Sequence, residues 1–339
     1  MFRKAVLTAG LTVAFLAASL VAPLTQPAFA DNPKIVLAPP GVPPIFISII
    51  AFVAQDQGFF KKYGVDVELR QFDNGTAASR AVVSGDIDAS MSATALLISQ
   101  IANADVPLVG IYGFPKPDFE LGTTNLAKAT CDDVKGQEIG VDVIGGARAI
   151  ALKAILAGGC HLTLDDVQQV ALGSNTASAL LAGQISYGIL HLDDVAELQN
   201  RGKKVAIIKT VRESSPSSQN LTIVVRKDTL ASKRDAFVRM MAGIIAAGRY
   251  MANPANADHV ATIAAVTGRD HAISLSALKD YLKYGLWAID NDGMDQAQTE
   301  AFIATQVKAG NIMDGKTPPT FDQMIDPSVW RDANAMVGK

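Results

Sequence analysis

Residues 74–89 read NGTAASRAVVSGDIDA and residues 175–189 read NTASALLAGQISYGI, so one pattern occurs twice, about a hundred residues apart. Each copy has a polar residue that suits a helix N-cap, a short apolar helix, a glycine that ends the helix, and a short strand. A strand-like run precedes each copy, at residues 65–69 and 167–172. Strand–helix–strand units of this kind build parallel sheets. The repeat therefore predicts an α/β protein with two lobes, each a mostly parallel sheet flanked by helices.

The first thirty residues have the pattern of a secretory signal peptide. Arg3 and Lys4 form a basic start, residues 5–21 are apolar apart from small and hydroxyl residues, and residues 28–30 form a small-x-small cleavage site. We predict cleavage after Ala30, with a membrane-spanning anchor as the alternative. Asp31, and no cysteine, follows the site, so no lipid attachment point is expected. This pattern favours the periplasm of a bacterium with two membranes.

Length and charge narrow the class of protein. The chain has 339 residues, enough for two domains of ordinary size. Without residues 1–30, the count of Lys and Arg falls from 30 to 28 against 33 Asp and Glu, which gives a net charge of −5. The basic residues do not cluster, so nucleic acid is not expected as a partner. No later stretch has the roughly 20 uninterrupted apolar residues of a membrane span.

The chain has two cysteines, Cys131 and Cys160. Cys131 precedes a strand predicted at residues 137–143, and Cys160 follows a helix predicted from about 147 to 157. A strand and its crossover helix run in opposite directions, so the start of one and the end of the other lie at the same edge of the layer. In an oxidising compartment this geometry predicts a disulfide. Two unpaired buried thiols are the alternative.

Two irregular segments look like crossings between the lobes. Residues 114–118 read FPKPD and residues 214–218 read SSPSS, and clusters of proline and serine are typical of connections. The chain would leave the first lobe, build the second, and return to finish the first with a mostly helical C-terminal part. The predicted lobes are residues 31–117 together with 221–339, and residues 118–220.

Five stretches, in order, resemble a known family. They are AQDQGFFKKYGVDVEL at 54–69, SGDIDA at 84–89, DVKGQEIGV at 133–141, LAGQI at 181–185 and TIVVRKD at 222–228. The set is similar to the periplasmic substrate-binding proteins of ABC importers, in the class that takes up sulfonates, nitrate and pyrimidine vitamin precursors. The resemblance implies the type II periplasmic fold with a two-strand hinge, a small ligand in the cleft, a monomer, and an ABC permease in the inner membrane as partner.

Candidate ligand-binding residues follow from where ligands bind in open α/β sheets, which is beyond the carboxyl ends of the strands. Helix starts there offer free N–H groups and a partial positive charge, which suit an anion. The candidates in the first lobe are Pro44, Phe46, Asn74, Gly75, Thr76, Ser92, Thr94 and Tyr112. The candidates in the second lobe are Gly145, Gly146, Arg148, Asn175, Thr176 and His191.

Each candidate also has a structural interpretation. The glycines would let a ligand approach the backbone, and the Ser, Thr and Asn residues could equally cap their helices. The Arg148 guanidinium could form two parallel hydrogen bonds to a carboxylate or sulfonate, although its position near a helix start is one where exposure to solvent is common. His191 could donate to the ligand or line the cleft. Phe46 and Tyr112 could stack on a planar ligand or pack in the core.

No motif indicates catalysis. The sequence has no His-Glu-x-x-His or Gly-x-Ser-x-Gly pattern, and its four histidines lack metal-ligand spacing, so neither a metal nor a cofactor is predicted. We therefore predict a periplasmic solute receptor for an ABC permease. The apolar loop at residues 43–46 favours a small organic anion, a sulfonate or carboxylate. The alternatives are a receptor for nitrate or a pyrimidine precursor, a receptor that serves a membrane sensor, and an exported enzyme.

Overall fold

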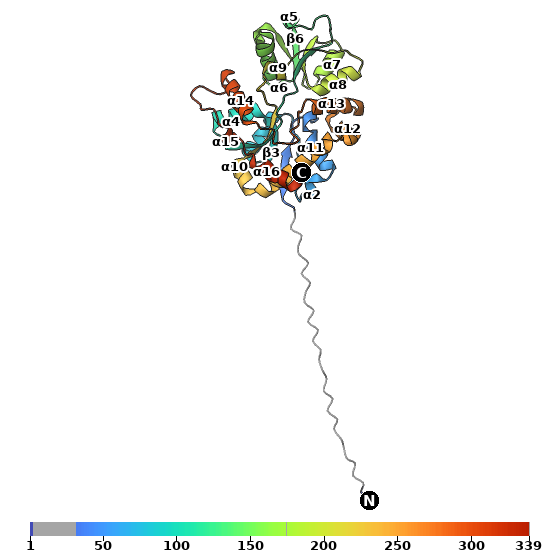
Figure 1. Cartoon of the computed structure of the whole chain (residues 1–339), viewed down its shortest axis with the longest axis vertical. Helices are drawn as coiled ribbons and strands as arrows, with labels where there is room; N and C mark the ends of the chain where they lie inside the picture. The colour runs from blue at the N-terminus through green and yellow to red at the C-terminus, as the bar shows by residue number, and fades with distance from the viewer. Residues whose placement is uncertain (3–31, 174, 339) are drawn as a thin grey trace. The chain divides into compact units, whose positions relative to one another are not determined.

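The computed structural model describes residues 1–2, 32–173 and 175–338 (Figure 1). The apolar part of the predicted signal peptide and its cleavage site lie outside the described residues. Residues Asn32–Lys339 form one compact unit. Within this unit, the names first lobe and second lobe denote the parts of the chain that are built around each of two sheets, with the bounds predicted above.

The first sheet has five strands in the order β2-β1-β3-β10-β4. β1 pairs in parallel with β2 and β3, whereas β10 is antiparallel to both β3 and β4. β10 comes from far along the chain, as the predicted return to the first lobe requires. The strands are β1 (Lys34–Ala38), β2 (Asp66–Leu69), β3 (Ala89–Ala93), β4 (Leu108–Gly113) and β10 (Leu221–Arg226).

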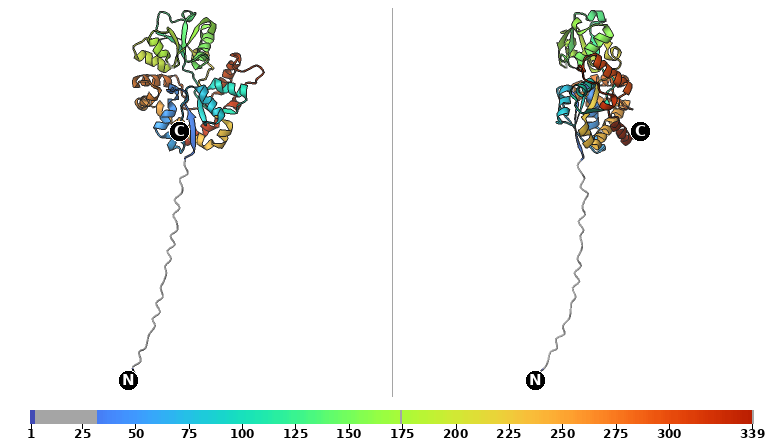
Figure 2. Two further views of the ribbon diagram at one scale, coloured as in Figure 1. Left: turned by 180° about the vertical axis from the view of Figure 1, so that it is seen from behind. Right: turned by 90° about the vertical axis from the view of Figure 1, so that its left-hand side faces the viewer.

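The second sheet repeats this design with the order β7-β6-β8-β5-β9. β6 pairs in parallel with β7 and β8, and β5 is antiparallel to β8 and β9. Its helices and strands are drawn mainly in green in Figures 1 and 2. The strands are β5 (Glu120–Thr123), β6 (Glu138–Val141), β7 (Gln168–Ala171), β8 (Tyr187–Leu190) and β9 (Ala206–Thr210).

The sequence repeat occupies the same place in both sheets. α3 (Gly75–Ser84) joins β2 to β3 on either side of β1, and α7 (Thr176–Leu181) joins β7 to β8 on either side of β6. The predicted parallel sheets are therefore confirmed. The first copy differs from this pattern in one detail. Its strand does not begin at Asp86, directly after the glycine that ends the helix, but at Ala89. Gly85 ends α3 with a φ of +83°, and the Asp86 N–H still bonds to Ala81 O at 2.9 Å, so the turn extends beyond Asp86.

Helices cover both faces of the first sheet. One face packs against α1, α11 and α16, and the other against α3, α4, α14 and α15. Among the described helices α11 is the longest, with 19 residues, and its buried residues recur at helical spacing. Its Gly243 permits close packing, because a Cβ there would lie 2.5 Å from Phe60 Cδ1. The remaining helices are α1 (Ile49–Asp56), α2 (Phe59–Lys62), α4 (Thr94–Ala104), α5 (Cys131–Val134), α6 (Ala147–Ile155), α8 (Leu192–Asn200), α9 (Val211–Ser214), α10 (Lys227–Ser232), α11 (Arg234–Ala252), α12 (Ala257–Ile263), α13 (His271–Lys283), α14 (Gln296–Lys308), α15 (Phe321–Met324) and α16 (Ser328–Val337).

Strand direction shows which sheet edges meet. β4 is parallel to β3, because β10 is antiparallel to both, and its carboxyl end leads directly into the second lobe. By the same reasoning β9 is parallel to β8, and its carboxyl end leads back to the first lobe. The loops that follow β1, β3, β6 and β8 therefore lie at the edges of the two sheets that face each other. We call the boundary between these edges the seam.

The two crossing segments run side by side. The Phe114 N–H bonds to Leu221 O at 2.8 Å, and the Asn220 N–H bonds to Phe114 O at 3.1 Å. These mutual bonds join the segments into a short two-stranded link. The predicted disulfide is also confirmed, since Cys131 and Cys160 are bonded with their Cα atoms 5.3 Å apart.

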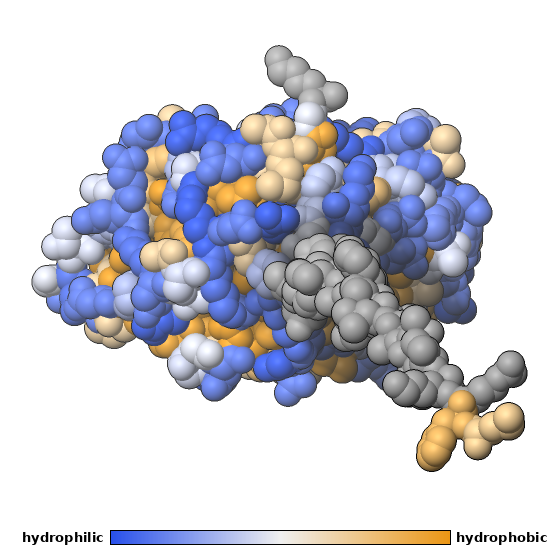
Figure 3. Space-filling view, turned by 90° about the horizontal axis from the view of Figure 1, so that it is seen from below, coloured by the Kyte–Doolittle hydropathy of each residue, from blue (hydrophilic) through white to orange (hydrophobic). Residues whose placement is uncertain are grey.

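One face of the molecule can be described by its hydropathy. Figure 3 shows a face on which hydrophilic residues predominate and apolar residues appear between them. Among the helices in the described part of the chain, none has both the length and the apolar character needed to cross a bilayer.

Candidate functional site

The loop after β1 brings apolar groups to the seam. Val42 is 62% exposed, although most valines in a fold of this size are buried. Pro44 and Phe46, two of the predicted ligand residues, are buried instead. The Phe46 ring lies 4.9 Å from the ring of Tyr281 on α13, so it belongs to the core of the first lobe. Val42 and Pro43 are thus the exposed apolar side chains of this loop.

The start of α3 leaves polar groups accessible. Asn74 and Thr76 are exposed, and Gly75 is half-buried. The Asn74 side-chain oxygen accepts a hydrogen bond from the Ala77 N–H at 2.9 Å, so the helix-capping role is present. The Asn74 amide group and the Thr76 hydroxyl remain at the surface of the seam. Ligand contact by these residues stays a prediction.

Three other candidates of the first lobe are buried and have partners inside the protein. The Ser92 hydroxyl lies 2.7 Å from that of Ser90, and the Thr94 hydroxyl lies 2.8 Å from that of Thr222 on β10. The Tyr112 hydroxyl donates to Ala288 O at 2.6 Å. Burial raises the pKa of Tyr112, so this hydroxyl stays protonated. In this arrangement all three hydroxyl groups hold the first lobe together.

Arg148, at the start of α6, is almost fully buried. Its exposed fraction is 6%, which rules out the alternative of a solvent-exposed side chain. The guanidinium donates to Asp194 Oδ2 at 2.7 Å and to Ile189 O at 2.5 Å, so it bridges the carboxyl ends of β6 and β8. Burial acts to raise the pKa of Asp194, but the charges of Arg148 and Arg269 hold it well below its usual range.

The loop before Arg148 contains a glycine in a left-handed conformation and exposed apolar side chains. Gly145 has a φ of +79°, a conformation that other residues rarely adopt, and no atom would lie within 4 Å of a Cβ there. Val143 and Ile144 are 56% and 64% exposed. A Cβ on Gly146 would lie 2.6 Å from an Asp142 carboxylate oxygen, so a larger residue there would have to displace that side chain. The second lobe therefore presents apolar side chains beside a buried cation.

The start of α7 contributes less. Asn175 is exposed and does not cap the helix with its side chain. Thr176 is fully buried, and its hydroxyl has no hydrogen-bond partner among the described residues. Its methyl group fills the space above Gly140 and Gly188, where a Cβ would lie 3.1 Å and 2.5 Å away, respectively. Thr176 thus packs against the sheet.

His191 lies beside the crossings in a buried polar cluster. Its Nδ1 is 2.8 Å from Asp118 Oδ2, and the Asn220 amide donates to Asp118 Oδ1 at 3.3 Å. The Tyr281 hydroxyl also donates to Asp118 and lies 3.1 Å from Asp193 Oδ1. Burial acts to lower the pKa of His191, but the charge of Asp118 raises it above its usual value. The histidine therefore carries positive charge at the hinge up to a higher pH than usual.

Arg269, at the start of α13, crosses the seam. Its guanidinium pairs with Asp193 and Asp194 and with Glu197, all on α8 of the second lobe. Leu192 from the same helix packs into the core of the first lobe. Burial acts to lower the pKa of Arg269, but its carboxylate partners raise it, so the group stays charged. Sequence reasoning missed Arg269, Tyr281 and Asp118, because each is a single polar residue without a local pattern.

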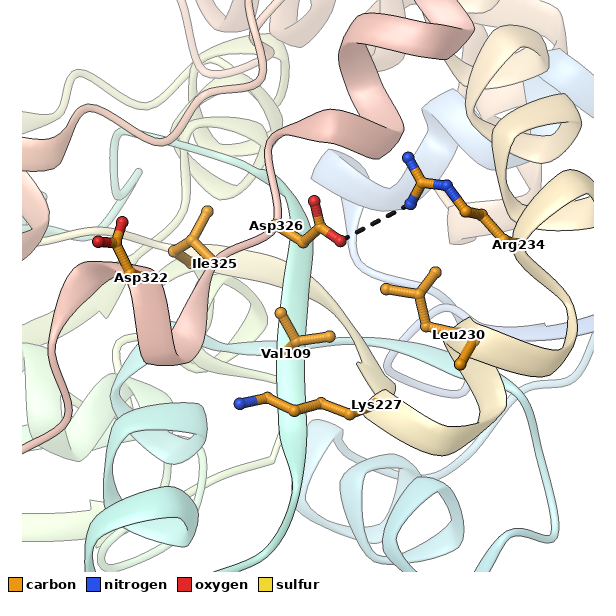
Figure 4. Close-up of a pocket in the computed structure, with 8 residues that line it drawn as sticks. Val109, Lys227, Leu230, Arg234, Asp322, Ile325 and Asp326 are labelled. Atoms are coloured by element: carbon orange, nitrogen blue, oxygen red, sulfur yellow. Dashed lines mark ion pairs between the residues drawn. The ribbon is translucent and has the colours of Figure 1, made fainter.

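Elsewhere, a pocket of about 440 Å³ lies between α10, α11 and the segment that includes α15 (Figure 4). Arg234 and Asp326 form an ion pair at 3.7 Å in its wall, and Lys227 donates to Gln323 O at 2.8 Å. Three of its charged groups, those of Arg234, Asp326 and Lys227, therefore have partners in the protein, and it lies away from the seam loops. Within residues 32–173 and 175–338, no group of three or more His, Cys, Asp or Glu side chains is placed to hold a metal ion.

Solved structures with this fold include binding proteins of several kinds. A protein of Bordetella bronchiseptica RB50 has a TM-score of 0.70 at 20% identity, covering 90% of this chain and 98% of its own. The periplasmic nitrate-binding protein NrtA of Synechocystis PCC 6803 has a TM-score of 0.69 at 13% identity, covering 90% and 89%. The periplasmic aliphatic sulphonate binding protein SsuA of Escherichia coli has a TM-score of 0.65 at 16% identity, covering 88% and 99%.

Sequence comparison gives the family. A relative from Brucella abortus (strain 2308), named as a putative binding protein, is 25% identical over 222 residues. The alignment spans 60% of this chain and 64% of that relative. The model of the NMT1/THI5-like family matches residues 46–257, which include both sequence repeats and both crossings. The chain therefore belongs to the NMT1/THI5-like family and has the two-lobed type II periplasmic binding protein fold.

Proposed function

We propose that this protein is a periplasmic solute receptor that binds a small organic anion at the seam and delivers it to an ABC permease. The observation that carries the proposal is the second lobe's combination of a buried guanidinium, Arg148, with exposed Val143 and Ile144 at the edge that faces the first lobe. A guanidinium suits a carboxylate or sulfonate, and apolar side chains suit the organic part of the ligand.

The first lobe would complete the site with matching chemistry. Exposed Val42 offers a second apolar surface, and Asn74 and Thr76 offer polar groups at a helix start. A ligand that contacts both lobes stabilises the arrangement in which they approach each other, because closure is favoured by contacts that exist only in that arrangement. Binding without chemical change is part of the proposal.

The relatives support an anionic ligand without identifying it. NrtA and SsuA are named for nitrate and aliphatic sulphonate, and another structure with this fold, at a TM-score of 0.61 and 13% identity, contains biphenyl-2-sulfinic acid. Exposed Val42, Val143 and Ile144 favour an organic anion over nitrate for this chain. The periplasmic location and the permease partner are inferred from the signal peptide pattern and the fold.

The test is a thermal-shift screen of the purified mature protein with aliphatic and aromatic sulfonates, carboxylates, a pyrimidine vitamin precursor and nitrate. A binder at a hundred times its Kd stabilises the folded state by about 2.7 kcal/mol. We expect an organic anion to raise the melting temperature. A response to nitrate without any response to an organic anion would refute the ligand class, and chemical conversion of the bound compound would refute the receptor.

Calorimetry with the best compound then tests Arg148. Losing a hydrogen bond to a charged group weakens binding by about 10- to 100-fold, so we expect that loss for Arg148→Gln and a smaller one for Arg148→Lys. Lys153→Gln is the matched control, because Lys153 is an exposed cation on the same helix. Equal affinity in Arg148→Gln and in the control would show that Arg148 does not hold the anion.

A further inference from the structure

A second pocket lies at the hinge, away from the seam loops. Its volume is about 420 Å³. Its walls come from both crossing segments, from α9 of the second lobe, and from the end of α13 and the start of α14 in the first lobe. The lining residues are Lys116, Pro117, Arg212, Pro216, Ser218, Lys283, Tyr284 and Gln298. Each part of the hinge therefore contributes to one concave surface.

Three cations line this pocket, and two of them, Arg212 and Lys283, lie over the ring of Tyr284. The Arg212 Cζ lies 4.7 Å and the Lys283 Nζ 5.2 Å from the centre of the Tyr284 ring. The Lys116 Nζ approaches the next residue, since a Cβ on Gly285 would lie 3.6 Å from it. The pocket therefore has three positive charges in its lining, and an anion bound there would be attracted to all three.

One of these three cations, Arg212, is already paired with a carboxylate of the protein. Arg212 pairs with Glu120 and also donates to Pro117 O at 3.1 Å. Burial raises the pKa of Glu120, and the charge of Asp280 acts in the same direction. Neither Lys116 nor Lys283 forms an ion pair with any residue that the structure describes. The lysines are thus the cations that an external anion would neutralise.

Hydrogen bonds from the residues that line the pocket connect it to both crossings. The Gln298 amide donates to Pro115 O at 3.1 Å on one crossing and to Ser218 O at 3.4 Å on the other. The Arg212 bond to Pro117 O joins α9 to the first crossing. An anion held in this pocket would therefore contact groups whose relative positions change when the lobes move.

We propose that the hinge pocket binds a small oxyanion, of the phosphate or carboxylate kind, between Lys116 and Lys283, and that the bound anion holds the two crossings in this arrangement. Lysines bind phosphate and carboxylate as point charges, and Ser218 and Gln298 add hydrogen-bonding groups to the lining. An anion that contacts both crossings favours one hinge geometry and thereby alters the affinity of the seam for its own ligand, and the effect is reciprocal.

The test is calorimetric titration of the mature protein with inorganic phosphate and, separately, with citrate at constant ionic strength, in the absence of any seam ligand. We expect at least one of the two to bind to the wild type. Lys116→Ala/Lys283→Ala should weaken that binding by about 100-fold, on the order of tenfold for each charged contact. The matched control is Lys61→Ala/Lys203→Ala, which removes two exposed lysines that do not line the pocket.

Hydrogen exchange reads out the hinge part of the proposal. The added anion should slow amide hydrogen exchange in residues 114–118 and 214–218 of the wild type and of the control. In the pocket variant the exchange rates of these residues should stay the same with and without the anion. If neither anion binds up to 20 mM, or if the pocket variant binds as the wild type does, the site is refuted. If the anion binds but exchange in the crossings does not change, the coupling to the hinge is refuted. Because no seam ligand is used, both results are independent of the proposed receptor function.

Discussion

Replacing Arg269 with glutamine should destabilise the protein more than replacing an exposed arginine such as Arg201. Arg269 pairs with Asp193, Asp194 and Glu197 from the opposite lobe, and its side chain is 18% exposed. Asp194 is fully buried, and the side chains of Asp193 and Glu197 are 10% and 13% exposed. The substitution leaves three adjacent carboxylates with less positive charge to balance them.

The expected cost follows from what each carboxylate retains. Breaking a buried ion pair by removing one partner costs about 3–5 kcal/mol. Asp194 keeps Arg148, and Asp193 keeps a hydrogen bond from Tyr281, so the lower end of this range applies. About 3 kcal/mol corresponds to a fall in melting temperature of about 6–12 °C, if a shift of 2–4 °C per kcal/mol for domains of 150–250 residues applies.

Arg201→Gln provides the control, because Arg201 pairs with Asp270 across the same seam at 3.6 Å. Those side chains are 55% and 72% exposed, and an exposed ion pair contributes about 0–1 kcal/mol. Scanning calorimetry at pH 7 compares the two variants with the wild type. If Arg269→Gln melts within 2 °C of Arg201→Gln, the buried carboxylates do not depend on Arg269 and our account of the seam is wrong.

Three further predictions concern other parts of the chain. Replacing Cys131 and Cys160 with serine should lower the free energy of unfolding in urea by about 3–4 kcal/mol, because the disulfide closes a loop of 29 residues; an equal loss in reduced wild type would confirm the cause. The raised pKa of His191 stabilises the protein fully below its unfolded value of about 6.5, and this contribution is lost as pH rises through the raised native value. Melting temperature should therefore fall with pH above about 6.5, and His191→Gln should flatten that slope. Gly158→Ala should cost about 1–3 kcal/mol in thermal unfolding, since its Cβ would lie 2.0 Å from Ser214 O, and an unchanged melting temperature would contradict this packing.

The elements that local patterns specify were predictable from the sequence. The two strand–helix–strand repeats and the disulfide depend on features that lie close together in the chain. Apolar periodicity likewise indicated α11, because a 19-residue helix presents enough turns for the pattern to be read. Short helices such as α5 and α9 were missed, since four residues give no periodicity.

The partners of the buried polar residues were not predictable. Arg148 was placed correctly near a helix start, but its partner Asp194 lies 46 positions further along the chain. Arg269 and Asp193 are 76 positions apart, and Tyr281 and Asp118 are 163 apart. Pairing over such distances depends on how the lobes pack, and no local sequence signal encodes it. For the same reason the sequence does not show that the Thr94 hydroxyl lies beside that of Thr222, 128 positions further along the chain.

The two lobes share one strand order but differ in what they bring to the seam. The buried hydroxyls of the first lobe, such as Thr94 and Tyr112, bond to other groups of that lobe, so it offers mainly shape and neutral polar groups. The second lobe places Arg148 at its edge, held by Asp194 in a fixed orientation. A guanidinium that is already held loses little conformational freedom when it binds an anion, so it can discriminate by geometry as well as by charge. Charge selection in this protein is therefore expected to depend on the second lobe, and selection for the organic part of the ligand on apolar groups from both lobes.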